Sequence, residues 1–208
     1  MFSIPIFPLP SVVLFPGVPL PLHIFEPRYR QMVAEALEGD RIIGMVLLRP
    51  GYESDYDGTP PIYPTGCSGL ITDVDRLDDG RYNLVLRGLD KFSIQREEPP
   101  AVGRLYRSAV VTPIDESVTA GARMSLKLER HRLQNLLAQQ FGGRLDGRLS
   151  ESMADEDLIN ALAQYLEFEP LEKLALLECN GPLARCRSII DLLEMKTMLR
   201  EGDPGRVH

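Results

Sequence analysis

The chain has 208 residues, of which 44% are hydrophobic and 25% charged, and it contains no tryptophan. This length is enough for one large or two small hydrophobic cores. The formal net charge is −7, and both halves of the chain are mildly acidic. Because no basic face is implied, we expect no nucleic-acid partner.

The ends and the cysteines bear on location and on metal binding. Met1–Pro5 carries no positive charge ahead of an apolar run, and no window of about 18 uninterrupted apolar residues occurs. We therefore expect a cytoplasmic protein with no membrane partner. Three cysteines, Cys67, Cys179 and Cys186, form no pattern of close-spaced pairs with histidine. They fit reduced, buried thiols in a chain without metal or other cofactor.

The N-terminal stretch is rich in proline, with seven between Pro5 and Pro27. Since proline lacks a backbone N–H and fixes φ, we expect short edge strands and tight turns here, not a central strand. Val12–Phe15 and Leu20–Phe25 are the predicted strands. Pro27 suits the first position of an amphipathic helix, and Gly39 is placed to end that helix in a left-handed conformation.

The segment from residue 42 to residue 112 is predicted to be rich in β-strands. Continuous or alternating apolar runs predict several strands, and an Asp-Gly turn at residues 77–80 joins two of them into a hairpin. Short strands with one crossing helix indicate a small curved sheet or pseudo-barrel. The predicted strands are Ile42–Leu48, Leu70–Val74, Tyr82–Leu86, Lys91–Gln95 and Ala109–Thr112.

The apolar periodicity changes from two to about 3.6 after residue 112. Leucine stripes then predict four helices that pack as a bundle. We therefore expect an α+β fold with two parts. Residues 1–113 form a β-rich pseudo-barrel lobe with one crossing helix, and residues 114–208 form a helical bundle lobe.

Two ordered blocks carry a family resemblance. Residues 7–32, FPLPSVVLFPGVPLPLHIFEPRYRQM, resemble the opening motif of the Lon protease N-terminal domain. Residues 66–71, 79–88 and 92–94 are similar to that family's central hairpin. Stand-alone bacterial proteins and cereblon share the pattern. The resemblance implies a PUA-like pseudo-barrel and a role in recognising polypeptide substrates.

The sequence offers little for catalysis. It contains no G-x-x-x-x-G-K-[ST] loop for nucleotide phosphates, so the ATPase part of a Lon protease is absent from these residues. The four lysines, Lys91, Lys127, Lys173 and Lys196, lie in a predicted strand or on charged helix faces without a serine motif. We therefore expect no enzyme activity, and we expect any ATPase or protease to be supplied by another chain.

An alternative rests on His23, which stands near Glu26 and Arg28. A deep polar pocket around these three residues would indicate a small-ligand-binding or enzymatic pseudo-barrel protein. A histidine in a family motif more often has a structural role, and Glu26 with Arg28 more often forms a local ion pair or helix cap. The motif by itself defines a fold and no reaction.

The long polar loop at residues 49–64 is the candidate binding segment. Long loops without secondary structure often bind a partner, and tyrosine suits interfaces. We predict Tyr52, Tyr56, Ile62 and Tyr63 as residues that contact a peptide or partner, while a variable surface insertion remains the simpler reading.

The leading hypothesis is a non-catalytic module that recognises unfolded or partner polypeptide. We expect apolar contact in a groove between the two lobes, with edge-strand backbone open to strand addition. An adaptor or regulatory role is equally compatible with the residues.

Overall fold

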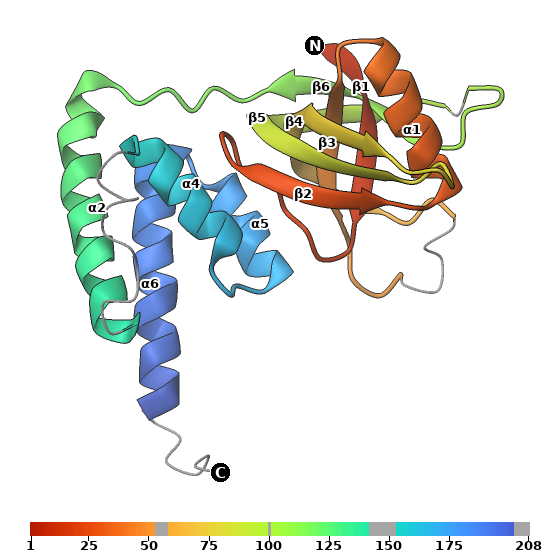
Figure 1. The fold of residues 1–208 in the computed structure, drawn as a ribbon. Coiled ribbons are helices and arrows are strands. Elements are labelled where there is room, and N and C mark those ends of the chain that lie inside the picture. The colour runs from red at the N-terminus through yellow and green to blue at the C-terminus, as the bar shows by residue number, and fades with distance from the viewer. Residues whose placement is uncertain (53–57, 100, 142–152, 202–208) are drawn as a thin grey trace, which may run out of the picture. The chain divides into compact units, whose positions relative to one another are not determined.

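The computed structural model describes residues 1–52, 58–99, 101–141 and 153–201. It confirms the predicted α+β fold (Figure 1). No helix in these described ranges is long and apolar enough to cross a membrane. The elements are β1 (Phe2–Leu9), β2 (Pro19–Ile24), α1 (Pro27–Glu38), β3 (Ile42–Leu48), β4 (Ile62–Arg76), β5 (Tyr82–Glu97), β6 (Arg107–Pro113), α2 (Ala120–Phe141), α4 (Asp155–Tyr165), α5 (Pro170–Glu178) and α6 (Gly181–Glu201).

The chain divides into two compact units. The barrel unit comprises Met1–Asp115 and Gln164–Glu178, and the helical unit comprises Glu116–Ala163 and Cys179–His208. Helix α5 thus packs with the strands although it lies late in the sequence. The sequence predicted a division into lobes at residues 1–113 and 114–208, and this division remains a prediction.

The strands form a six-stranded sheet in the order β2-β5-β4-β3-β1-β6, and β6 also pairs with β5. This extra pairing closes a barrel. Strand β5 makes it possible because its first half pairs with β2 and its second half pairs with β6. Irregularities in the β4–β5 and β5–β6 registers provide the bends that closure requires.

Strand β1 runs through the proline-rich start of the chain, where we predicted no central strand. Its first half pairs antiparallel with β6 and its second half pairs parallel with β3. Pro5 lies in the first half and Pro8 in the second, so each missing N–H can face the side without a partner strand. The strand predicted at Val12–Phe15 is wrong, since these residues form a buried loop.

The barrel interior is filled by aliphatic side chains around Phe92. The cluster consists of Ile4, Ile6, Val46, Phe92, Ala109 and Val111. Two glycines make room for the ring. A Cβ on Gly66 would lie 2.6 Å from Phe92 Cζ, and a Cβ on Gly44 would lie 3.0 Å from the same atom. The small residues in β3 and β4 therefore let the strands curve closely around one aromatic side chain.

Helix α1 packs beside β1 and the loop that precedes β6. The Phe7 and Tyr29 rings lie 4.3 Å apart, and the Tyr29 hydroxyl donates to the Pro8 carbonyl at 3.3 Å. The Tyr106 hydroxyl donates to Glu35 Oε2 at 2.6 Å. Burial, together with this carboxylate, raises the pKa of Tyr106 to about 12. These contacts attach α1, the predicted helix of the barrel lobe, to β1 and to the loop before β6.

Polar contacts attach the segment that contains α5 to the barrel. The Phe15 N–H donates to Gln164 Oε1 at 3.1 Å. The Tyr165 hydroxyl donates to the Pro19 carbonyl. The Lys173 ammonium donates to the Gln164 carbonyl at 2.7 Å, and burial lowers the pKa of Lys173. Residues 164–178 are therefore part of the barrel unit.

The helical unit contains a fully buried arginine. Arg185 on α6 donates to Asn160 Oδ1 at 2.5 Å and to Glu116 Oε1 at 2.7 Å. These contacts join α6 to α4 and to the start of the connection before α2. Two ion pairs also connect α2 to α6, one between Arg187 and Glu129 and one between Arg132 and Glu194.

Candidate functional site: an apolar groove beside α5

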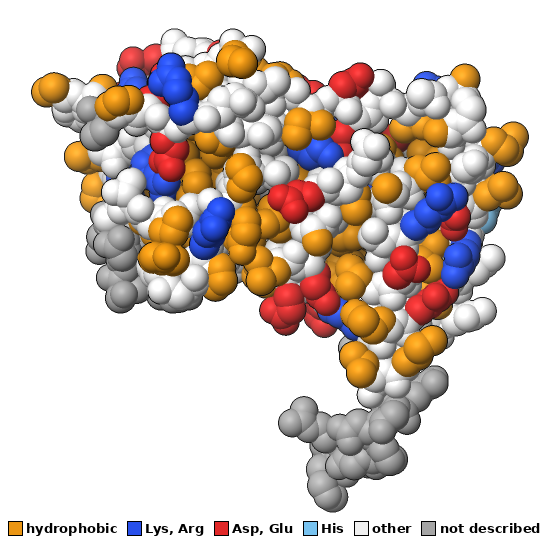
Figure 2. Space-filling view, turned by 180° about the vertical axis from the view of Figure 1, so that it is seen from behind, with side chains coloured by type: hydrophobic (Ala, Val, Ile, Leu, Met, Phe, Trp, Pro, Cys, Tyr) orange, Lys and Arg blue, Asp and Glu red, His pale blue; other side chains and the backbone are white. Residues whose placement is uncertain are grey.

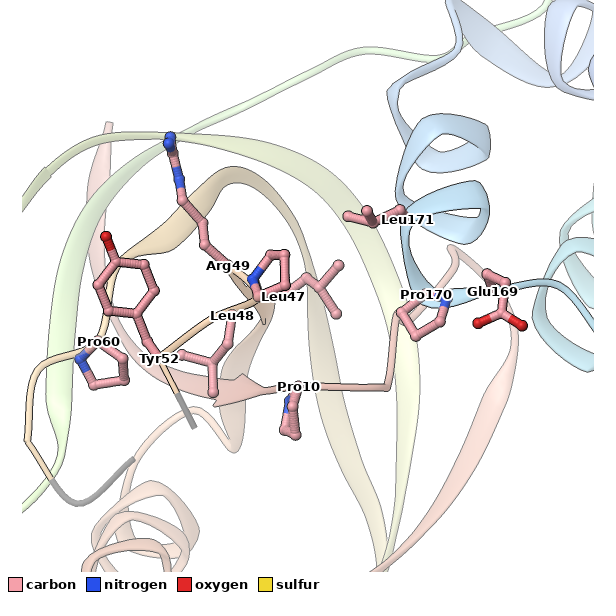
Figure 3. Close-up of a pocket in the computed structure, with 10 residues that line it drawn as sticks. Pro10, Leu47, Leu48, Arg49, Tyr52, Pro60, Glu169, Pro170 and Leu171 are labelled. Carbon is pink, nitrogen blue, oxygen red and sulfur yellow. The ribbon is translucent and has the colours of Figure 1, made fainter. Parts of the chain in front are cut away.

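The barrel unit carries an apolar groove with a volume of about 670 Å³. Figure 3 shows Tyr52, Pro60 and Arg49 on one side, Leu47, Leu48 and Pro10 in the middle, and the start of α5 on the other side. In the space-filling view of Figure 2, hydrophobic side chains gather on a face of the barrel unit, with charged side chains between them. The lining residues are Pro10, Leu47, Leu48, Arg49, Pro50, Tyr52, Pro60, Glu169, Pro170 and Leu171.

The floor of the groove lies where two parallel strands end. Leu9 pairs with Leu47, so the carboxyl ends of β1 and β3 reach the same edge of the sheet. Leu47 is 2% exposed and Leu48 is 7% exposed. Pro10 follows β1 directly and interrupts the backbone pairing. The floor is therefore an apolar surface formed by the ends of two paired strands.

The first turn of α5 forms the opposite wall. Pro170 stands at the first helical position, where its missing N–H costs nothing. The Glu172 carboxylate accepts from the Glu169 backbone N–H at 2.8 Å, as in a capping box. Leu174, Leu176 and Leu177 are buried, while Leu171 is 49% exposed beside the groove. The helix thus buries its other leucines and leaves Leu171 free to contact a ligand.

The four residues predicted to contact a peptide have different surroundings in the structure. Tyr52 lines the groove and is 47% exposed. Ile62 is half-buried and packs against the barrel core. Tyr63 is half-buried under Arg49, whose guanidinium carbon lies 5.3 Å from the ring centroid. Tyr56 lies outside the described residues. The contact role of all four residues stays a prediction.

The free edge of β2 is a poor template for strand addition. The Val18 carbonyl accepts from the Gly88 N–H at 3.0 Å, so alternate residues from Val18 onward face β5. Pro19 and Pro21 then face the open edge, where they offer no donor, and the Pro19 carbonyl is taken by Tyr165. The edge of β2 therefore offers few backbone groups for the strand addition that the sequence suggested.

His23 lines an open, mostly apolar hollow of about 630 Å³ with residues of β2, β4 and β5, which differs from the deep polar pocket of the alternative hypothesis. Its Nδ1 lies 2.7 Å from Asn83 Oδ1, and its Nε2 lies 3.3 Å from an Arg81 guanidinium nitrogen. Because a guanidinium only donates, Nε2 accepts and Nδ1 carries the proton. Both ring nitrogens are thus engaged. Glu26 and Arg28 pair with each other at 2.8 Å, and Arg28 lines a separate small cavity.

The cysteines have the expected surroundings. Cys67 and Cys186 are buried and Cys179 is half-buried, and none of these three forms a disulfide. Burial raises the pKa of Cys186 to about 12, which keeps this thiol protonated and unreactive. In the described ranges, no group of three or more His, Cys, Asp or Glu residues could hold a metal ion.

Sequence reasoning missed most of the groove. Leu47 and Leu48 were predicted as a strand end and Pro170 as a helix start, but nothing in their local pattern brings the two together. Besides the predicted Tyr52, a local signal was Leu171, an apolar residue at the solvent-facing start of a helix whose buried face lies elsewhere.

Comparison with known proteins identifies the family. Residues 3–195 match the family model of the ATP-dependent protease La (LON) substrate-binding domain. Lon protease 2 of Myxococcus xanthus is 26% identical over 197 residues, which cover 93% of this chain and 24% of that protein. Lon protease 2 of Sorangium cellulosum is 27% identical, over 92% of this chain and 24% of that protein. The chain thus spans about a quarter of the length of these relatives.

Two solved structures of Lon N-terminal domains resemble this chain in fold. A Lon N-terminal domain protein from Xanthomonas campestris matches with a TM-score of 0.63 and 25% identity, over 92% of this chain and 98% of that one. The N-terminal domain of a Mycobacterium avium complex Lon protease matches with a TM-score of 0.68 and 17% identity, over 93% and 98%. By the extent of the family match and by its fold, this chain belongs to the family of Lon substrate-binding domains.

Proposed function

We propose that the barrel unit binds exposed apolar segments of polypeptide in the groove beside α5, and that it does so without catalysing a reaction. The observation that supports this most is the groove itself, a cavity of about 670 Å³ with a floor of buried leucines. Its volume lies within the usual range for ligand sites. The family match to a substrate-binding domain supports a polypeptide ligand.

The chemistry of the lining favours side-chain recognition over backbone pairing. Leu47, Leu48 and Leu171 offer apolar surface, and Tyr52 adds an amphipathic ring at the rim. Prolines around the groove remove backbone donors that a strand-forming ligand would need. Such a site suits unfolded chains, in which apolar side chains are exposed in many sequence contexts.

Binding alone would neither unfold nor cleave a polypeptide. We propose that these steps depend on ATPase and peptidase domains, which the 208 residues do not contain. Their supply by another chain, an adaptor role and a cytoplasmic location stay predictions. The alternative of a small-ligand or enzymatic protein has less support, because the hollow of about 630 Å³ beside His23 is open and both nitrogens of His23 are already engaged.

Leu171→Asp tests the proposal. A carboxylate at this position faces the apolar floor, and a bound apolar segment would have to desolvate it. We expect a short fluorescent peptide rich in leucine and phenylalanine to bind at least about tenfold more weakly, by fluorescence anisotropy. Val102→Asp is the matched control, because Val102 lies in the same unit and is fully exposed. Equal binding by both variants would contradict the proposal.

A further inference from the structure

Arg49 holds a fixed position at the rim of the groove. Its backbone N–H donates to the Pro61 carbonyl at 2.9 Å, and its side-chain Nε donates to the Ile62 carbonyl at 3.2 Å. The guanidinium also lies over the Tyr63 ring, with 5.3 Å between its carbon and the ring centroid. The backbone hydrogen bond fixes the main chain, and the two side-chain contacts with the same segment orient a guanidinium that would otherwise sample many rotamers.

Within the described ranges, no hydrogen bond or ion pair engages the terminal nitrogens of Arg49. Across the described ranges, ion pairs engage Arg28, Arg81, Arg107, Arg130, Arg132, Arg185 and Arg187, whereas Arg49 lies within ion-pair distance of no carboxylate. A guanidinium presents its N–H groups as a planar fork that matches a carboxylate. With Nε already bonded to Ile62, the two amino groups remain to bind a carboxylate at the groove.

The charges of the lining are also separated. Glu169 stands on the α5 side of the groove, and Arg49 stands on the strand side. A carboxylate of a ligand would be repelled at the first position and attracted at the second. Between them the described lining is apolar, so the ligand would combine a hydrophobic part with one acidic group.

We propose that the groove prefers apolar polypeptide segments that carry a carboxylate beside the hydrophobic residues, and that Arg49 binds this carboxylate. This inference rests on the proposed function. The carboxylate has two possible sources, the C-terminus of a polypeptide or an Asp or Glu side chain within it. Both present the same two oxygens to the guanidinium.

The test uses one apolar peptide in three forms: with a free C-terminal carboxylate, with a C-terminal amide, and with the amide and one internal glutamate. The full chain is compared with Arg49→Gln and with Arg49→Lys, which keeps the charge and loses the fork. Arg96→Gln is the matched control, since Arg96 is exposed elsewhere in the same unit. Thermal unfolding of each variant verifies that it is folded.

We expect at least one carboxylate form to bind the full chain about tenfold more tightly than the neutral amide. Whichever carboxylate form is preferred identifies the source. This preference should disappear in Arg49→Gln, fall in Arg49→Lys and persist in Arg96→Gln. Binding of all three forms with equal affinity would overturn the role of Arg49 and leave the proposed function standing. Failure of every form to bind would overturn the proposed function itself.

Discussion

Gly88→Ala is expected to destabilise the barrel unit by about 3 kcal/mol or more, because added atoms have no space there. A Cβ on Gly88 would lie 2.0 Å from the Phe15 carbonyl oxygen and 2.8 Å from its carbon. Both are backbone atoms, so no side-chain rotation relieves the overlap. The loop would have to move, and the hydrogen bonds from Gly17 to Gly88 and from Gly88 to Val18 would break.

Urea unfolding followed by circular dichroism measures this loss. Gly121→Ala in α2 is the control, since no described atom outside its own helix turn lies within 4 Å of its Cβ position and alanine suits a helix. We expect that variant to be at least as stable as the original protein. A Gly88→Ala protein as stable as Gly121→Ala would contradict the close approach of the Phe15 carbonyl to β5.

Arg185→Met is expected to destabilise the helical unit by about 3 to 5 kcal/mol. The Arg185 side chain is 0% exposed and joins Glu116 on the connection before α2 with Asn160 on α4. Removing it takes away the cation that faces a largely buried carboxylate. Breaking such a pair costs far more than losing an exposed one, because the remaining charge is desolvated.

A double variant separates the lost pair from simple loss of packing. Arg185→Met with Glu116→Leu removes both charges, and we expect it to recover part of the stability measured by urea unfolding. Arg132→Met is the exposed comparison, since its side chain is 56% exposed, and its loss should be much smaller. If Arg185→Met unfolds at the same urea concentration as Arg132→Met, the buried pair does not hold the unit together.

Local patterns in the sequence predicted much of the barrel unit. Ile42–Leu48 is a strand with the predicted ends, and the Asp-Gly turn is present, with Gly80 at a φ of 80°. Helix α1 begins at Pro27 as expected. These features depend on apolar periodicity and on turn residues, which act over a few positions and can be read from the chain directly.

Other features depend on contacts between distant residues. Strand β1 tolerates Pro5 and Pro8 only because its two halves pair with different strands. Gly39 ends α1 without the expected left-handed conformation, which Arg41 adopts instead with a φ of 63°. The groove could not be predicted because Leu48 and Leu171 come together only through the attachment of residues 164–178 to the barrel.

The most direct test of polypeptide binding in the groove is a titration of the isotope-labelled full chain with the apolar peptide, followed by amide chemical shifts in NMR spectra. We expect the largest shift changes at Leu47, Leu48 and Leu171, with little change at His23 and Asn83. The reverse pattern, with changes centred on His23, would contradict this account and favour a ligand site on the outer face of β2 and β5.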